Sequence, residues 1–343
     1  FGARAYAENP SDDTLHEIIK TCALRGVKVF ITLNTLYKEN EIQKVLDFVE
    51  KVYSYGAYGL IVQDLGMVNL IKKYYPNIRI SASTQMTVHN SEAIDMLTEM
   101  GCSRIVLARE LGQKEITDIC SKKGNTEIEG FIHGALCVCY SGRCLMSSII
   151  GQRSGNRGRC AQPCRMEYSL LKDDKTLKSG YLLSPKDIST AEILDKVLAT
   201  GVDSLKIEGR MKSPEYVYQV VSTYRKYVDE VMENGTLTID KEDISNLTQI
   251  FNRGGSSSHG YYDTYSSLNM LSKSPKSSGV EIGVVTGYNP KNKRCSIKLS
   301  RPVTAGDGIE IWTQTEPHVG TNVSKHSKAG EVITIALEGD INK

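Results

Sequence analysis

The sequence predicts an α/β protein: a TIM-like (β/α)8 barrel, truncated at its N-terminus, with a cysteine-rich insertion and a small C-terminal all-β module. Three observations support this prediction. Short β-branched runs alternate with amphipathic helical patterns through the first two thirds of the 343 residues. Five cysteines crowd into one stretch between two of these runs. Beyond the last long helical pattern, only strand-like runs follow a stretch rich in Gly and Ser.

Six runs have the composition of buried parallel strands: residues 27–33, 59–63, 78–82, 103–108, 128–133 and 203–207. Amphipathic patterns predict helices over 41–52, 91–100, 191–199 and 214–232. Several helical patterns close on a glycine suited to a left-handed C-cap, at Gly26, Gly56, Gly101 and Gly201. The first five runs start at the spacing of βα units, about 25 residues, which favours a barrel over an open, doubly wound sheet. A closed barrel has eight strands, and we expect the missing two to precede Phe1.

The last two runs start 75 residues apart, which leaves room for an insertion of about fifty residues beyond one βα unit. We place this insertion at 137–183, and the polar and apolar alternation in its second half predicts a hairpin around 172–175. The barrel is then expected over 1–235 and a linker over 236–278. A small β-barrel-like module is expected over 279–343, because runs at 280–286, 295–299, 308–313 and 331–337 have no helices between them.

Composition excludes several classes of protein. With 40% hydrophobic and 24% charged residues the chain resembles an ordinary globular protein and not a disordered one. Lys+Arg number 42 against 40 Asp+Glu, so the net charge of +2 gives no global signal for nucleic acid. No run approaches the roughly 18 apolar residues of a membrane span, and the start lacks the layout of a secretory signal. We therefore expect a cytoplasmic protein without membrane contact, in which clustered cysteines indicate metal and not disulfides.

The cysteine cluster is the most specific feature of the sequence. The stretch 130–166 contains five arginines and no Asp or Glu, and this positive field is expected to lower thiol pKa values and favour thiolates. The proposed ligands are Cys137, Cys144, Cys160 and Cys164, separated by 6, 15 and 3 residues. Four thiolates suit either a zinc site or a [4Fe-4S] cluster. Structural zinc prefers close Cys pairs on both sides, so we favour the cluster and keep zinc as the alternative.

Two other interpretations of these cysteines stay open. Free cysteines are often buried small hydrophobic residues, although Cys160 and Cys164 lie among Arg, Gln and Pro instead of Val and Leu. Cys139 is interpreted as a non-ligand because Cys137 and Cys139 are a cramped pair for one cluster. The main alternative is that Cys139, and not Cys137, is the ligand.

Polar residues at the carboxyl ends of the predicted strands are candidates for the active site of a barrel. They are Asn34, Gln63, Asp64, Thr84, Gln85, Arg109, Glu110, His133, Glu208 and Arg210. Taken singly, each is more often a solvated or structural polar residue. Arg109, Arg143 and Arg210 could clamp a dicarboxylate or a phosphate through bidentate hydrogen bonds. We assign His133, Glu208, Arg210 and Lys206 to catalysis, and Asp64, Gln85, Arg109, Glu110 and Arg143 to substrate binding.

Two of these assignments have structural alternatives. Lys206 could face the barrel interior or merely pair with Glu208. His133 could move protons near neutral pH, lie behind Cys137 or be an ordinary core histidine.

A peptidase would need a nucleophile with a base, or a His-Glu-x-x-His zinc motif, and neither is found in the sequence. The arginine-rich loops and exposed tyrosines could instead form an RNA surface.

Four motifs resemble the signature of the U32 family, historically called collagenase-like peptidases. The first two are EGFIHGALC at 129–137 and YSGRCLMS at 140–147. They are followed by NRGRCAQPCR at 156–165 and LKIEGRMK at 205–212, with SPKD at 184–187 between them. The similarity covers residue 1 to about residue 262, and more weakly the C-terminal module, while the family's opening strand and its Ala-Pro-rich turn are absent.

The resemblance implies a TIM-like barrel and, for one branch of the family, an oxygen-independent hydroxylase with a [4Fe-4S] cluster. Such members hydroxylate tRNA, ribosomal RNA or the ubiquinone ring, and prephenate is implicated as oxygen donor in the RNA branches. The four proposed ligands match cysteine positions of the RNA-modifying members; the ubiquinone members place theirs somewhat differently. We therefore expect an enzyme that hydroxylates a pyrimidine in tRNA or rRNA and that depends on prephenate or a similar small carboxylate. The alternatives are a U32 peptidase and a zinc-stapled RNA-binding module.

Overall fold

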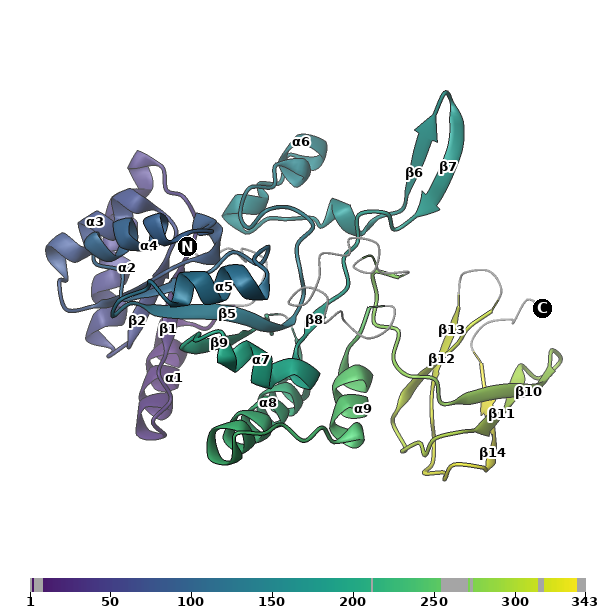
Figure 1. The fold of residues 1–343 in the computed structure, drawn as a ribbon. Coiled ribbons are helices and arrows are strands. Elements are labelled where there is room, and N and C mark those ends of the chain that lie inside the picture. Colours follow the sequence, from purple (N-terminus) through teal and green to yellow (C-terminus); the bar gives the residue numbers. More distant parts are fainter. Residues whose placement is uncertain are drawn as a thin grey trace. The chain divides into compact units, whose positions relative to one another are not determined.

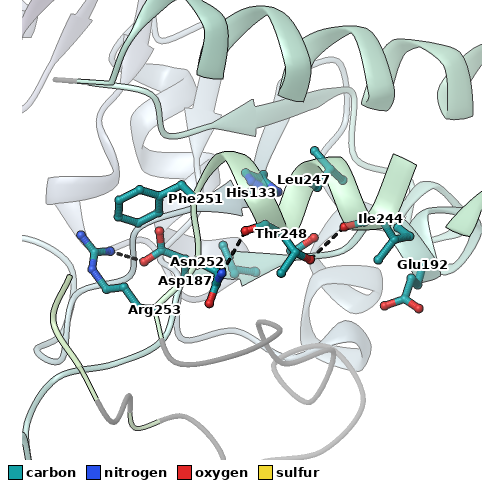
Figure 2. Close-up of a pocket in the computed structure, with 11 residues that line it drawn as sticks. His133, Asp187, Glu192, Ile244, Leu247, Thr248, Phe251, Asn252 and Arg253 are labelled. Atoms are coloured by element: carbon teal, nitrogen blue, oxygen red, sulfur yellow. Dashed lines mark hydrogen bonds and ion pairs between the residues drawn. The ribbon is translucent and has the colours of Figure 1, made fainter. Parts of the chain in front are cut away.

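The computed structural model describes residues 2, 9–210, 212–253, 271, 274–313 and 318–337 of the chain (Figure 1). The chain divides into two compact units, Phe1–Ser278 and Gly279–Lys343, and each is described by itself. Among the described residues, no helix combines the length and apolarity needed to cross a membrane.

The first unit is built on a curled parallel sheet. Six parallel strands pair in chain order: β1 (Phe30–Leu33), β2 (Gly59–Val62), β3 (Arg79–Ala82), β4 (Arg104–Val106), β5 (Glu127–Gly134) and β9 (Ser204–Ile207). All six predicted strands are therefore confirmed. A consecutive order is that of a barrel wall, whereas a doubly wound sheet reverses its order. The described strands form an open half-barrel, because β1 and β9 do not pair with each other. The seventh strand of this sheet, β8 (Ile188–Ser189), pairs antiparallel with the end of β5.

Helices join these strands (Figure 1). Their buried side chains share one hydrophobic core with those of the sheet. These helices are α1 (Asp12–Leu24), α2 (Ile42–Ser54), α3 (Leu65–Tyr74), α4 (Ser91–Glu99), α5 (Gln113–Cys120), α7 (Leu194–Ala199), α8 (Pro214–Asn234) and α9 (Lys241–Ile250). The side chains of Ser11, Asn90 and Ser213 accept backbone N–H groups at helix starts. The predicted C-cap glycines all have positive φ: 70° at Gly26, 84° at Gly56, 94° at Gly101 and 85° at Gly201.

The face of the sheet opposite Ile128 and Ile132 carries charged side chains across three neighbouring strands. Arg104 of β4 pairs with Glu127 of β5 at 2.7 Å and with Glu129 at 3.3 Å, and Lys206 of β9 pairs with Glu129 at 2.7 Å. Alternation along β5 places both carboxylates on the same face. Burial raises the pKa of Glu129, but Lys206, Ser204 and Arg104 outweigh burial, so its pKa is lowered and the carboxylate is charged.

The cysteine-rich insertion separates β5 from β8. It contains α6 (Met146–Gly151), two short 3-10 helices, η3 (Gly155–Arg157) and η4 (Pro163–Arg165), and a hairpin of β6 (Tyr168–Lys172) and β7 (Lys175–Gly180). The hairpin lies where the alternation predicts it. Asp173 and Asp174 have φ of 49° and 59°, and two consecutive positive values are typical of the tight turn that joins two strands. In Figure 1 the hairpin extends away from the sheet.

The stretch expected to be a linker, 236–278, contains helix α9, and Leu247 of this helix is buried in the core of the first unit. The described residues of the second unit form strands β10 (Gly283–Asn289), β11 (Arg294–Leu299), β12 (Gly308–Ile311), β13 (Val319–Asn322) and β14 (Val332–Ala336). The second unit has its own core around Cys295, Ile297 and Ile333. Strand β13 was not predicted, because its residues Val-Gly-Thr-Asn have little apolar content.

Candidate active site

The candidate site lies at the carboxyl ends of the parallel strands, where Arg109 is its central charged residue. The Arg109 guanidinium stacks 4.2 Å from the centroid of the Phe131 ring, and its Nη2 lies 4.0 Å from Oε2 of Glu208. Its Nε is buried and has no hydrogen-bond partner among the described residues. A buried guanidinium nitrogen without an acceptor is costly. Arg109 is therefore suited to receive an anionic or carbonyl-bearing ligand.

Two amides at neighbouring strand ends share this property. The side-chain Oε1 atoms of Gln63, after β2, and Gln85, after β3, are buried, and neither has a donor within the described part of the chain. The backbone N–H of Ser83 donates to the carbonyl of Val62 at 2.8 Å, which holds the two strand ends together. Each buried acceptor without a partner costs about 1–3 kcal/mol. The structure thus places two unsatisfied acceptors and one unsatisfied donor at one end of the sheet.

Glu208 reaches this end of the sheet because of a glycine. A Cβ on Gly134 would lie 2.4 Å from the carbonyl oxygen of Glu208, and Gly134 has a φ of +106°, so the approach of these two strand ends requires glycine. The carboxylate of Glu208 accepts the backbone N–H of Arg210 at 3.0 Å. The structure therefore brings Glu208 and Arg109 together, with Arg210 in the adjoining loop.

Glu110 and Arg143 belong to a contact that attaches the cysteine loop to the sheet. The side chain of Glu110 accepts the backbone N–H of Ser141 at 3.0 Å and the Ser141 hydroxyl at 3.3 Å. Ser141 is buried, and in the sequence it lies between Cys139 and Cys144. The Thr87 hydroxyl donates to the Ser141 carbonyl at 2.6 Å and accepts from Nε of Arg143 at 3.1 Å. These contacts give both predicted substrate-binding residues a role in loop attachment.

Asp64 and Lys206 also have structural contacts. Asp64 is the N-cap of α3, accepting the backbone N–H groups of Met67 at 3.0 Å and Tyr37 at 3.2 Å. Lys206 pairs with Glu129 and not with Glu208, the structural partner suggested by the sequence. Their roles toward a substrate stay predictions.

His133 lies behind the candidate site, on the side of the sheet covered by α8. The register of β5 against β9 shifts between Phe131 and His133, and such a bulge re-aims a side chain. The His133 ring contacts Tyr216 and Tyr224 of α8, and its Nδ1 lies 3.3 Å from the Tyr224 hydroxyl. Burial, with a smaller contribution from Lys212, lowers the pKa of His133 to about 4. His133 is therefore neutral at physiological pH.

All nine cysteines are free, and five of them lie in the insertion. Cys137 and Cys160 are exposed residues, whereas Cys139, Cys144 and Cys164 are half-buried. Gly155 packs against two of them: a Cβ there would lie 3.8 Å from the carbonyl oxygen of Cys144 and 3.9 Å from Sγ of Cys160. The insertion thus brings Cys144 and Cys160 next to one glycine, although they are 16 residues apart in sequence.

The expectation that the arginines lower the thiol pKa values is wrong for three of the cysteines. The Cys137 residue as a whole is exposed, but its thiol is desolvated, which raises its pKa; the backbone N–H of Cys139 and the charge of Arg109 do not offset this effect. Burial likewise raises the pKa of Cys139 and of Cys164, although Arg165 lies beside Cys164. Desolvation disfavours a thiolate more than these arginines favour it. A metal that bound here would have to displace protons from these thiols.

The four predicted ligands are electrostatic neighbours but do not form a closed site for one ion. The thiols of Cys144 and Cys160 both raise the pKa of Cys137 and that of Cys164. Within the described ranges, no three His, Cys, Asp or Glu side chains converge closely enough to hold a metal ion. A [4Fe-4S] cluster uses one thiolate for each of four irons, so its ligands lie further apart than those of a single zinc ion. The four cysteines supply the thiolate ligands that a [4Fe-4S] cluster requires.

Sequence reasoning missed His89 as part of this site. Its Nδ1 lies 2.9 Å from the Thr87 carbonyl, so Nδ1 carries the hydrogen, because a carbonyl only accepts. Its buried Nε2 has no hydrogen-bond partner in the described part of the chain and lies 3.6 Å from Oε2 of Glu110. The sequence signal was available, since His89 follows the third strand at the same end of the sheet as Gln85.

Comparisons with known proteins agree with the resemblance seen in the motifs. The sequence model of peptidase family U32 matches residues 1–271. The chain is 31% identical to the tRNA hydroxylation protein P1 of Bacillus subtilis strain 168, over 91% of this chain and 76% of that protein. It is 34% identical to the 23S rRNA 5-hydroxycytidine synthase of Escherichia coli K12, over 96% of this chain and 50% of that protein. It is also 33% identical to a collagenase of Porphyromonas gingivalis, over 72% of this chain and 63% of that protein.

Proposed function

The chain belongs to peptidase family U32, and from this membership we propose that it is an RNA-modifying enzyme that hydroxylates a pyrimidine base in tRNA or rRNA. Two relatives that align with more than nine tenths of the chain are named for RNA hydroxylation. The chain spans half the length of the rRNA synthase, so the activity of the whole protein is part of the proposal. The observation that carries it is the attachment of the cysteine-rich insertion to this end of the sheet, where Ser141 hydrogen-bonds the side chain of Glu110 and accepts the backbone N–H of Arg109 at 3.4 Å.

A [4Fe-4S] cluster is the proposed cofactor. Cys137, Cys144, Cys160 and Cys164 would hold it, and the Ser141 contact with Glu110 would fix the loop on which the first two lie. When bound, the cluster would supply redox chemistry. Zinc is the less favoured occupant, since the described thiols do not converge as the four ligands of one ion do.

The small co-substrate is proposed to bind at Arg109. A carboxylate beside the guanidinium could accept from Nε, while the amides of Gln63 and Gln85 could turn to donate to a second oxygen. Prephenate or a similar small dicarboxylate fits this combination of one cation and two amides. Glu208, at 4.0 Å from Arg109, is proposed to orient that guanidinium or to exchange a proton with the ligand.

The RNA is proposed to bind the insertion. Arg143, Arg153 and Arg159 bring positive charge to it without a nearby acid in sequence, and Tyr140 exposes 62% of its surface. Phosphates are attracted to such charge, and an exposed ring offers a stacking face for an unpaired base. Under this proposal the RNA would lie next to the cysteines that would hold the cofactor.

Nucleoside mass spectrometry tests the activity directly. Total tRNA and rRNA from a strain lacking the gene should lose one hydroxylated pyrimidine, and the wild-type gene should restore it. The Cys160→Ala variant should fail to restore it, whereas Cys22→Ala, a control outside the insertion, should behave as wild type. An unchanged nucleoside profile in the deletion strain would refute RNA hydroxylation.

Purification without oxygen tests the cofactor. Wild-type protein and Cys22→Ala should carry about four iron and four sulfide per chain, and Cys160→Ala should lose most of both. A colourless protein with one zinc per chain would instead support the zinc-stapled module.

Peptidase activity is the second candidate function, because one relative of the chain is named a collagenase. No histidine in the described ranges hydrogen-bonds a Ser, Thr or Cys side chain, as the base of a hydrolytic nucleophile would. Gelatin cleavage by the purified protein, abolished by one substitution near Arg109, would favour the peptidase over the hydroxylase.

A further inference from the structure

The second unit carries an exposed aromatic pair at the end of its β12–β13 hairpin. Trp312, the only tryptophan of the chain, follows β12, and His318 precedes β13. Their rings stack with centroids 5.4 Å apart and an interplanar angle of 6°. Trp312 is 60% exposed, so the face of the indole opposite His318 is open to solvent. Tryptophan is highly buried on average and is enriched where proteins bind their partners.

Polar contacts fix both rings of this pair. Nε1 of Trp312 donates to Oε2 of Glu310 at 3.0 Å. The backbone N–H of Thr313 donates to Nδ1 of His318 at 3.3 Å, so the hydrogen of the neutral imidazole is on Nε2. The indole N–H is already used, and what Trp312 offers a ligand is its flat face. A ring that is held in place before binding loses little conformational freedom when a second flat ring stacks on it.

A basic turn joins β10 to β11 in the same unit. Lys291, Lys293 and Arg294 are exposed within four residues. Two asparagine side chains shape the turn: Asn289 accepts the backbone N–H of Lys291 at 3.0 Å, and Asn292 accepts that of Arg294 at 3.2 Å. Neither Lys291 nor Arg294 forms an ion pair with another residue that the structure describes. The turn therefore presents positive charge to solvent.

Strand pairing connects this turn to the aromatic pair. Arg294 lies opposite Ala336 in the ladder of β11 and β14, and the hydroxyl of Thr321 on β13 donates to the carbonyl of Ala336 at 3.0 Å. Two residues before Thr321, β13 pairs with Ile311, the neighbour of Trp312. With about 5 Å between paired strands and about 3.3 Å per residue along a strand, this path is at most about 25 Å long. At about 3.4 Å per nucleotide, a single strand of about eight nucleotides covers it.

We propose that the second unit binds single-stranded RNA, with an unpaired base stacked on Trp312 and phosphates held by Lys291 and Arg294. A flat aromatic face near exposed positive charge matches a polymer that carries flat rings on an anionic backbone. A protein partner would need an apolar surface around the indole, and Glu310 and Thr313 beside it are polar. The site extends the RNA contact beyond the insertion, and the identity of the bound RNA rests on the proposed function.

Intrinsic fluorescence tests the stacking on the full wild-type chain. Because the chain has one tryptophan, its emission reports on Trp312 alone. A 12-nucleotide oligouridylate should quench this emission to a plateau, and more oligonucleotide should be needed as salt is raised. Heparin is a polyanion without bases, so it should compete with the oligonucleotide and leave the emission nearly unchanged. Equal quenching by heparin would overturn the stacking of a base.

Variants separate the contribution of the ring from that of the charges. Loss of one base stack should weaken binding of a labelled oligouridylate about 5- to 150-fold in Trp312→Ala, and less in Trp312→Phe, which keeps an aromatic ring. Lys291→Gln combined with Arg294→Gln should reduce the slope of log affinity against log salt by about 1.4, since each phosphate contact to a single strand contributes about 0.7. The matched control is Tyr218→Ala on α8, which removes a ring with 76% exposure and should bind as wild type.

These measurements do not require turnover, so their outcome is separate from that of the activity test. No saturable quenching by the oligouridylate, or an unchanged affinity in Trp312→Ala, would overturn the site on the second unit. Quenching together with an unchanged nucleoside profile in the deletion strain would support this site and refute RNA hydroxylation.

Discussion

Replacing Arg165 tests how the insertion is anchored. The Arg165 guanidinium donates to the hydroxyl of Ser184 at 2.8 Å and to the carbonyl of Pro185, and its other amino group donates to the carbonyl of Leu136 at 3.0 Å. Leu136 precedes the insertion and Ser184 follows it, so one side chain joins both ends of 137–183. We expect Arg165→Ala to loosen the cysteine loop without unfolding the sheet.

The size of the effect follows from these bonds. A hydrogen bond from a charged donor contributes about 1.5–3 kcal/mol, and a buried carbonyl left without a donor costs about 1–3 kcal/mol. Arg165 is only half-buried, so water replaces part of what is lost, and we expect about 3 kcal/mol for Arg165→Ala. Because 1.4 kcal/mol is a factor of ten, local opening of the insertion should become about 100-fold more frequent.

Hydrogen exchange followed by mass spectrometry measures this opening directly. Amides of α6 and η4 should exchange about 100-fold faster in Arg165→Ala, while those of β2 and β3 should be unchanged. The matched control is Arg225→Ala, which removes an exposed arginine paired with Asp229 on α8 and should shift stability by less than about 0.5 kcal/mol. Unchanged protection of the insertion in the Arg165 variant would show that the loop is held by other contacts.

Three further predictions concern the packing around the site. The pKa of His133 is lowered to about 4, and the histidine of the unfolded chain takes up its proton first as the pH falls. The unfolding free energy of the wild type should therefore decrease by up to about 3 kcal/mol between about pH 6.5 and pH 4. Urea unfolding of His133→Asn should lack this part of the pH dependence, and parallel curves for the two proteins would contradict it. Gly134→Ala places a Cβ 2.4 Å from a backbone oxygen, whereas Gly235→Ala, with a φ of +70°, meets nothing within 4 Å. The first should therefore lower unfolding free energy by at least about 2 kcal/mol more than the second, and equal losses would refute the steric argument. Tyr224→Phe removes the acceptor of a buried backbone N–H at 2.9 Å and should cost about 1–3 kcal/mol. Tyr218→Phe, on a side chain with 76% exposure, should cost less than about 0.5 kcal/mol; similar melting temperatures for the two tyrosine variants would argue against this role.

The candidate site was predictable in its location and less so in its roles. Strand ends are visible in sequence, so Gln85, Arg109 and Glu208 could be placed at one end of the sheet. Their hydrogen-bond partners could not, because partners such as Ser141 and Glu110 are 31 residues apart. Loop attachment by Glu110 and N-capping by Asp64 therefore became visible only in the structure. The thiol pKa values show the same limit, since burial cannot be read from the count of nearby arginines.

The sequence by itself determined the local elements: the six strands, the glycine C-caps and the tight turn at 173–174 depend on hydrophobic period and backbone preference, which act within a few residues. It also placed the cysteines in one insertion. Only the tertiary structure decided the electrostatics and the direction of each side chain. A bulge in β5 turned His133 toward α8, and burial removed water from the thiol of Cys137. Desolvation arises from residues distant in the chain, so no local pattern encodes it.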